Sequence, residues 1–298
     1  MHTSVLLQET IDNLDLKKGD SVLDGTINNA GHSLLIAERI GERGVLIGLD
    51  EDRTALVRAK ENLASLKHPP RIELVEENFR NLDTVLDSLK IPSIDKIIFD
   101  IGLSSDQLEV SGRGFSFKRD EPLLMTMSAI PRLGQRTALE IVNSWSEEEL
   151  ADAIFTYGEE RFSRRIAKGI VEARSRDLIT TTGTLEKIIK DSVPAWYARG
   201  KIPPATKTFQ GIRICVNDEL NALAEGLKKG VEKLSSGGRI AVITFHSLED
   251  RIVKNFFRDM VKTGSFIAIT KKPIVPKREE VLVNPRSRSA KLRVLLKK

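Results

Sequence analysis

The sequence predicts an α/β fold in which a parallel, doubly wound sheet is interrupted by an all-α insertion. Short apolar runs alternate with helix-like spacing over residues 21–100, which is typical of successive strand–helix units. Residues 136–194 then show helical spacing alone, before the alternation resumes. We therefore expect a discontinuous α/β domain of residues 1–118 and 205–298, with a helical insertion of residues 119–204.

The first part of the sheet is predicted to contain four strands. A short helix over residues 6–14 precedes the first strand, which ends at Asp24. The next three strands are expected to end at Asp50, Val75 and Asp100. The helices that separate these strands are predicted over residues 33–40, 54–66 and 81–89.

The second part of the chain carries the insertion and the rest of the sheet. The helices expected in the insertion cover residues 138–145, 147–157, 161–173 and 184–192. A helix over residues 218–234 is followed by a predicted turn at residues 235–238 and a fifth strand over residues 238–245. Two further strands, residues 266–270 and 290–296, are expected to pair and close the sheet.

The composition indicates a globular chain with a substantial core, because 40% of its 298 residues are hydrophobic and 30% are charged. No apolar run reaches the length of a membrane span, and the first residues lack the features of a signal peptide, so we expect no membrane partner. Cys215 is the single cysteine, which excludes an internal disulfide and suits a reducing cytoplasm. The net charge of +5 permits a nucleic-acid partner without requiring one.

The turn after the first strand indicates an adenosine-containing cofactor. Its sequence, Gly25-Thr-Ile-Asn-Asn-Ala-Gly31, lacks the G-x-G-x-x-G pattern of dinucleotide-binding folds. Three acids, Asp24, Asp50 and Asp100, end strands of the predicted sheet, and an acid after the second strand can accept hydrogen bonds from ribose hydroxyls. Each acid alone is equally explained as a helix cap, but ligands of open α/β sheets bind at these strand ends.

Several motifs occur in order along nearly the whole chain. They are His2-Thr-Ser-Val-Leu-Leu, Asp100-Ile-Gly-Leu-Ser-Ser-Asp-Gln107, Arg113-Gly-Phe-Ser-Phe117, Tyr157-Gly-Glu-Glu-Arg-Phe162, Ala205-Thr-Lys-Thr-Phe-Gln210, Phe245-His-Ser-Leu-Glu-Asp-Arg-Ile-Val-Lys254 and Asn284-Pro-Arg-Ser-Arg-Ser289. Together they resemble the RsmH (MraW) family of bacterial S-adenosylmethionine-dependent enzymes, which methylate N4 of a cytidine in 16S rRNA. The resemblance implies a class I methyltransferase fold, with a Rossmann-like sheet and an inserted all-α domain for substrate recognition.

The resemblance also implies the cofactor site. The residues expected to bind S-adenosylmethionine are Asp24, Ala30, Gly31, His32, Asp50 at the ribose, Phe79 at adenine, and Asp100 and Gln107 near the methionine end. The chain departs from the family at Asn28 and Ala30, where glycine is usual. Asparagine tolerates a positive φ, whereas alanine there costs stability or changes the path of the loop.

Methylation of a cytosine amino group requires an acceptor, because the nitrogen lone pair is delocalised into the ring. Asp100 is the best-placed acceptor, with Ser104 and Ser105 as orienting hydroxyls. The alternative is that Asp100 only binds the cofactor. The sequence contains no Cys/His cluster with ligand spacing, so we expect no metal.

His246 follows the fifth strand directly. We expect Ser247 and Asp250 to form a capping box for the next helix, which leaves His246 either to face the substrate or to be a hydrogen-bonded structural residue.

Substrate contacts are expected from the insertion and its flanks. Phe209 either stacks on an extruded base or lies in the core, and Arg213 and Asn217 are candidate RNA contacts. Arg161, Arg164, Arg165 and Lys168 lie at helical spacing, either as a solvated face or as a contact for the rRNA backbone.

The prediction for the whole chain is methyl transfer from S-adenosylmethionine to N4 of a cytidine in 16S rRNA of the small ribosomal subunit. The alternative is an RNA-binding or ribosome-assembly protein that keeps the fold without catalysis. A DNA amino-methyltransferase is disfavoured, because Asp100-Ile-Gly-Leu103 is not an Asp/Asn-Pro-Pro-aromatic motif. The sequence leaves a homodimer open.

Overall fold

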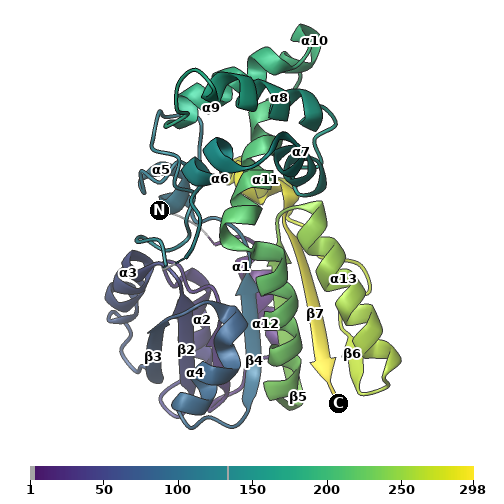
Figure 1. The fold of residues 1–298 in the computed structure, drawn as a ribbon. Coiled ribbons are helices and arrows are strands. Elements are labelled where there is room, and N and C mark those ends of the chain that lie inside the picture. Colours follow the sequence, from purple (N-terminus) through teal and green to yellow (C-terminus); the bar gives the residue numbers. More distant parts are fainter. Residues whose placement is uncertain (1–3, 133) are drawn as a thin grey trace. The chain divides into compact units, whose positions relative to one another are not determined.

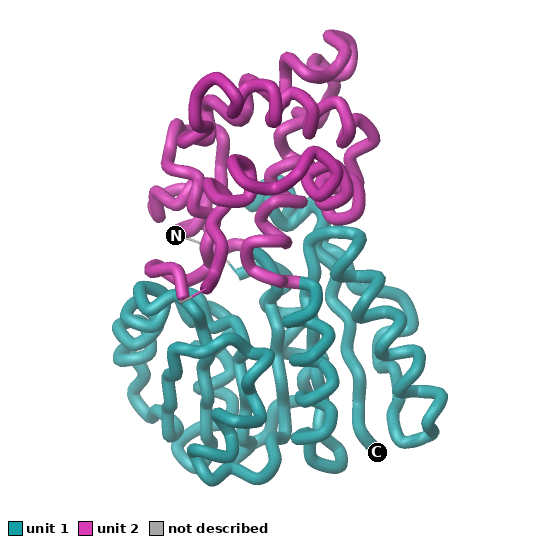
Figure 2. Tube along the Cα trace, viewed as in Figure 1, with its two compact units in different colours: residues 1–102, 220–298 teal, residues 103–219 magenta. Residues whose placement is uncertain are grey.

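The computed structural model describes residues 4–132 and 134–298, so His2 and Thr3 of the first motif lie outside the described residues. The chain divides into two compact units (Figure 2). An α/β unit comprises residues 1–102 and 220–298, and a helical unit comprises residues 103–219. No helix within the described ranges is long and apolar enough to cross a bilayer.

The α/β unit contains a seven-stranded sheet of order β3-β2-β1-β4-β5-β7-β6 (Figure 1). Its strands are β1 (Ser21–Asp24), β2 (Val45–Asp50), β3 (Arg71–Glu76), β4 (Ile94–Asp100), β5 (Leu234–Thr244), β6 (Phe266–Ala268) and β7 (Lys291–Lys297). Strands β1 to β5 pair in parallel, and β7 runs antiparallel between β5 and β6. The predicted α/β fold with a doubly wound sheet is confirmed, including the closing pair of strands.

Helices cover both faces of this sheet. On one face lie α1 (Leu7–Leu14), α2 (Gly31–Ile40) and α3 (Arg53–Leu63), and on the other lie α4 (Leu82–Ser88), α12 (Glu219–Lys233) and α13 (Ser247–Lys262) (Figure 1). Adjacent strand residues alternate between the two cores: Leu46 and Ile98 pack with the first group, while Ile47 and Phe99 pack with the second. Because both faces of the sheet are covered by helices, successive residues of a strand such as Leu46 and Ile47 are both buried, and the strands read as continuous apolar runs.

The start of β5 differs from the prediction. Residues 235–238, expected as a turn, belong to the strand, which begins at Leu234. Leu234 pairs with Ile94, and the register then shifts before Lys96 pairs with Arg239. The Gly/Ser-rich sequence therefore forms an irregularity in the pairing of β4 with β5, and not a turn before β5. Gly237 has a φ of 78° there.

The helical unit has its own core. Its helices are α5 (Ser105–Glu109), α6 (Ala138–Ser144), α7 (Glu147–Thr156), α8 (Ser163–Arg174), α9 (Thr182–Ser192), α10 (Ala195–Ala198) and α11 (Pro204–Asn217). The insertion is predicted from the sequence to span residues 119–204, whereas the compact unit spans residues 103–219. The reason is that Phe115 and the α11 residues Phe209 and Ile212 are buried in the helical core.

The tail of the chain adds short elements to the α/β unit. They are α14 (Arg278–Val283) and a 3-10 helix at Pro285–Ser289, and a second 3-10 helix lies earlier at Phe79–Asn81. α14 is tied to the first described residues, because the Leu6 amide donates a hydrogen bond to Glu280 Oε1 at 2.8 Å.

Candidate active site

The turn between β1 and α2 adopts a left-handed backbone at both positions where the chain departs from the glycine pattern. Asn28 has a φ of 48° and Ala30 a φ of 61°. The Asn28 amide donates to Asp50 Oδ2 at 3.0 Å, and its side chain donates to the Thr26 carbonyl at 3.0 Å. The turn is therefore tied to the end of β2. Its two non-glycine residues adopt the left-handed conformation that glycine adopts most easily.

The start of α2 approaches the N-terminal segment closely. A Cβ atom at Gly31 would lie 1.9 Å from Ser4 Oγ, so a side chain at Gly31 would displace Ser4. Ala30 precedes this glycine as the N-cap of α2 and is fully buried. The first turn of α2 follows the end of β1 after a short loop, and the free amide groups of such a helix start commonly bind an anionic or hydroxyl-bearing ligand.

Two of the three predicted acids are held by neighbouring donors. Asp24 accepts from Ser33 Oγ at 2.6 Å and from the Thr26 amide at 3.1 Å. Asp50 accepts from the amides of Asn28 and Asp52 at 3.0 and 2.9 Å. Burial nevertheless raises the pKa of Asp24 to about 6 and that of Asp50 to about 7.

Asp100 at the end of β4 is the least compensated acid. Its amide donates to Thr26 Oγ1 at 2.7 Å, but its buried Oδ1 has no hydrogen-bond partner among residues 4–132 and 134–298. Burial, followed by the charges of Asp24 and Glu249, raises the pKa of Asp100 to about 8. The side chain as a whole is 19% exposed, so Asp100 is not completely enclosed by the protein.

His32 lies beside Asp100 but brings no positive charge. Its Nε2 atom lies 3.1 Å from the Val5 carbonyl oxygen, which only accepts, so Nε2 carries the proton. Burial lowers the pKa of His32 to about 4, and the ring is neutral at pH 7. The distance from Nδ1 to Asp100 Oδ2 is 3.7 Å, too long for a hydrogen bond. His32 therefore adds no positive charge that would repel a cationic ligand beside Asp100.

Phe79 lies at the end of β3, where it was predicted to contact adenine. It is partly buried, and its ring packs on Phe99 at a centroid distance of 4.9 Å. Thr26 and Ser33, which bond the strand-end acids, are not among the predicted site residues. The sequence signal for them is a hydroxyl residue shortly after a strand that ends in an acid. Such a hydroxyl can form a hydrogen bond with that carboxylate or with the backbone of a neighbouring strand end.

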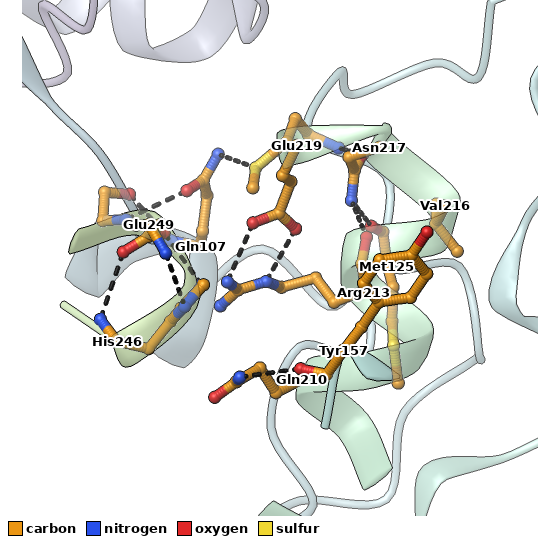
Figure 3. A network of polar contacts seen from close by, with 12 residues as sticks. Gln107, Met125, Tyr157, Gln210, Arg213, Val216, Asn217, Glu219, His246 and Glu249 are labelled. Carbon is orange, nitrogen blue, oxygen red and sulfur yellow. Dashed lines mark hydrogen bonds and ion pairs between the residues drawn. The ribbon is translucent and has the colours of Figure 1, made fainter. Parts of the chain in front are cut away.

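The predicted capping box of α13 is wrong. The box is formed by His246 and Glu249: His246 Nδ1 accepts from the Glu249 amide at 3.4 Å, and Glu249 Oε2 accepts from the His246 amide at 3.1 Å (Figure 3). Asp250 instead accepts from Arg293 at 2.7 Å and Lys291 at 3.0 Å. The imidazole can cap because one ring nitrogen accepts, a role that the residue-type rule for caps does not include.

His246 thus has a structural role in addition to any contact with substrate. Its Nε2 atom lies 3.0 Å from Glu249 Oε1, and Glu249 is itself buried. The pair fixes the orientation of the imidazole at the start of α13.

In the helical unit, Ser104 and Gln107 form a capping box for α5. The Gln107 amide donates to Ser104 Oγ at 3.1 Å, and Gln107 Oε1 accepts from the Ser104 amide at 2.9 Å. Ser105 is the first residue of that helix. The hydroxyl of Ser104 is therefore engaged in the local fold of the loop.

Two of the predicted substrate residues, Arg213 and Asn217, belong to a polar network at the end of α11 (Figure 3). Arg213 makes a two-pronged ion pair with Glu219, with distances of 2.8 and 2.9 Å. The Asn217 side chain donates to the Met125 carbonyl at 2.7 Å and accepts from the Met127 amide at 2.8 Å. Phe209 is 4% exposed and packs edge-to-face on Phe117, so it lies in the core. Asn217 and Phe209 are thus held within the unit, in positions that organise the loop before α6.

The strain at Ala30 can be measured by substitution. We expect Ala30→Gly to leave the free energy of unfolding unchanged or to raise it by up to about 1 kcal/mol, because relief of the left-handed backbone offsets the lost methyl burial. Ala37, equally buried in the middle of α2, is the matched control. Ala37→Gly should lower the same free energy by at least about 1 kcal/mol. Equal losses in chemical denaturation would contradict the left-handed assignment.

The carboxyl groups make the ligand-free protein less stable as pH rises. A carboxyl whose folded pKa is raised stabilises the fold at low pH, and this contribution is lost as pH rises through the folded pKa, here toward 8 for Asp100. We expect Asp100→Asn to remove more than roughly 1 kcal/mol of the stability difference between pH 5 and pH 8.5. Asp12→Asn, at an exposed position on α1, should keep the wild-type difference. Identical pH profiles of unfolding for wild type and Asp100→Asn would exclude a raised pKa.

The sequence of this chain is similar to those of known proteins. The sequence model of the MraW methylase family matches residues 1–298. A Brevibacillus brevis protein named ribosomal RNA small subunit methyltransferase H is 44% identical over 308 aligned positions, covering 98% of this chain and 96% of that protein. A protein of the same name from Persephonella marina is 46% identical over 293 positions, covering 98% of each chain.

A solved structure shares the fold. The crystal structure of a candidate rRNA methylase from Clostridium thermocellum superposes with a TM-score of 0.50 at 15% identity, covering 100% of both chains. The identity of the sequences over nearly their full length, together with the strand order and the acids at the strand ends, leads to one conclusion. The chain belongs to the MraW methylase family.

Proposed function

We propose that this protein transfers the methyl group of S-adenosylmethionine to the exocyclic N4 of a cytidine in 16S rRNA of the small ribosomal subunit. The observation that carries the proposal is the buried Asp100 Oδ1, which has no hydrogen-bond partner within the described residues, at the strand end next to the left-handed turn after β1. The names of the relatives support the rRNA substrate, since they are small subunit methyltransferases. An rRNA substrate also agrees with the cytoplasmic location expected from the sequence.

The residues at the strand ends fit this cofactor. Asp50 retains lone pairs beyond its two backbone bonds and can accept from the ribose hydroxyls. The buried Oδ1 of Asp100, which has no hydrogen-bond partner in the part of the chain that the structure describes, suits the cationic methionine end of the cofactor. Phe79 offers an apolar surface for adenine. When bound, S-adenosylmethionine supplies an electrophilic methyl group on a positively charged sulfur.

Asp100 is the residue we propose to accept the proton of the cytosine amine. A carboxyl group with a pKa of about 8 is a stronger base than an exposed aspartate, and general bases are effective when their pKa lies near the working pH. A nearby cation favours the ionised form that this role requires. Thr26 positions the carboxyl by accepting a hydrogen bond from the Asp100 amide.

The helical unit is proposed to contact RNA. Arg164 and Arg165 are exposed on α8, and both are suited to phosphate groups. Contacts of this kind should weaken with added salt, because counterions are released from the RNA on binding. The RNA-binding protein without catalysis is not favoured, since the turn after β1 keeps its left-handed path despite Asn28 and Ala30.

The proposal is tested by incubating the protein with labelled S-adenosylmethionine and small ribosomal subunits that lack the modification. We expect label on N4 of one cytidine of 16S rRNA. Asp100→Asn should lower kcat at saturating cofactor by a factor of about 10² or more, because the proton acceptor is lost.

Two outcomes would contradict parts of this account. An increase in the KM for cofactor with an unchanged kcat would make Asp100 a cofactor ligand alone. No label on rRNA with the wild-type protein, despite stoichiometric cofactor binding in calorimetry, would exclude the proposed reaction. Asp12→Asn serves again as the exposed control and should match the wild type in both constants.

A further inference from the structure

An aromatic cluster centred on an arginine lies on the helical unit and has no part in the reaction described above. The Arg161 guanidinium carbon lies 4.9 Å from the ring centre of Phe162, 5.0 Å from that of Trp196 and 4.7 Å from that of Tyr197. The three rings contact one another edge-to-face, at centroid distances of 4.7 to 6.2 Å. We call these four residues the aromatic platform.

A buried acid fixes two residues of the platform by hydrogen bonds. Glu160 is fully buried and accepts from the Tyr197 hydroxyl at 2.7 Å and from the Phe162 amide at 2.9 Å. Gly158 permits this arrangement, since a Cβ atom there would lie 2.4 Å from the Lys207 carbonyl oxygen. The segment joining α7 and α8 is thereby fixed against α11, and the rings are preorganised rather than loose.

The outer ring of the platform faces solvent. Trp196 is 64% exposed, which is unusual for the residue with the largest apolar side chain. The exposed Arg161 contacts its ring, and the exposed residues Arg164, Arg165 and Lys168 lie on α8, which begins two residues after Arg161. Arg165 also approaches the Phe162 ring, at 6.0 Å. Packing against the core of the helical unit explains Phe162 and Tyr197. It does not explain why Trp196 is exposed beside Arg161.

We propose that the aromatic platform binds an unpaired base of the RNA substrate, which stacks on Trp196 while Arg161 and the arginines of α8 contact the flanking phosphates. Single-stranded RNA is recognised by such combinations of aromatic rings and arginine, because every base has a π face and every linkage a negative charge. The positive charge around Trp196 favours this polyanion over an apolar protein surface. The inference rests on the proposed rRNA substrate and assigns a second contact, distinct from the methylated base.

The experiment measures fluorescence anisotropy of a labelled oligocytidylate of about ten nucleotides, and of an abasic oligomer with the same number of phosphates. We expect Trp196→Ala to weaken binding of the oligocytidylate roughly tenfold, and Trp196→Phe to stay within about threefold of the wild type, because phenylalanine also stacks. The abasic oligomer should bind the wild type and Trp196→Ala equally. Phe155→Ala is the matched control, since Phe155 on α7 is an aromatic residue of similar exposure, at 62%.

A second readout follows the indole directly. The chain has two tryptophans, so Trp145→Phe leaves Trp196 as the only one. Its fluorescence should be quenched by the oligocytidylate and unaffected by the abasic oligomer. Unchanged affinity in Trp196→Ala, or equal quenching by both oligomers, would overturn the proposal. So would weaker binding to ribosomal subunits with unchanged oligocytidylate affinity, because that result assigns the platform to a protein. Methylation of subunits by the wild type tests the proposed function separately.

Discussion

The burial of carboxyl groups at the ends of β1, β2 and β4 is the constraint on which the site depends. Asp24 is stabilised by the Ser33 hydroxyl on α2, and Asp50 by the Asn28 amide of the turn after β1. Asp100 instead retains a buried oxygen without a hydrogen-bond partner in the described chain. The neighbouring imidazole of His32 is neutral and cannot compensate. An acceptor oxygen without a donor in the described chain therefore lies at the edge of the sheet where ligands of such folds bind. A cationic ligand there would stabilise the ionised carboxylate.

The same constraint accounts for the turn at Asn28 and Ala30. A change of its path would remove the donor that Asn28 gives to Asp50. The hydrogen bond from Asn28 to Asp50 offsets part of the cost of the left-handed backbone at the two non-glycine residues. The helical unit is stabilised independently by its own core and by the Arg213–Glu219 pair and the Asn217 amide. Catalytic chemistry and RNA contact can thus be assigned to units with separate cores.

Most strands and helices were predictable, because the strands are short continuous apolar runs, the helices repeat apolar residues with a period of 3.6, and both signals are local. The start of β5 was not, because a Gly/Ser-rich run predicts a turn while pairing with Ile94 extends the strand. The role of Phe209 depends on which residues it meets, and the Asn217 contacts reach back about ninety residues to Met125 and Met127. The strand-end acids were found from sequence, but the lack of a partner at Asp100 Oδ1 is a three-dimensional property.

Proton exchange on cofactor binding tests the central claim most directly. Calorimetric titration with S-adenosylmethionine at pH 7, repeated in buffers that differ in ionisation enthalpy, counts the protons released for each cofactor bound. Because Asp100 with a pKa of about 8 is mostly protonated at this pH and should ionise beside a cation, we expect release of about one proton, reduced toward zero in Asp100→Asn. Binding with no proton release by the wild type would show that Asp100 is already ionised, and would contradict the account.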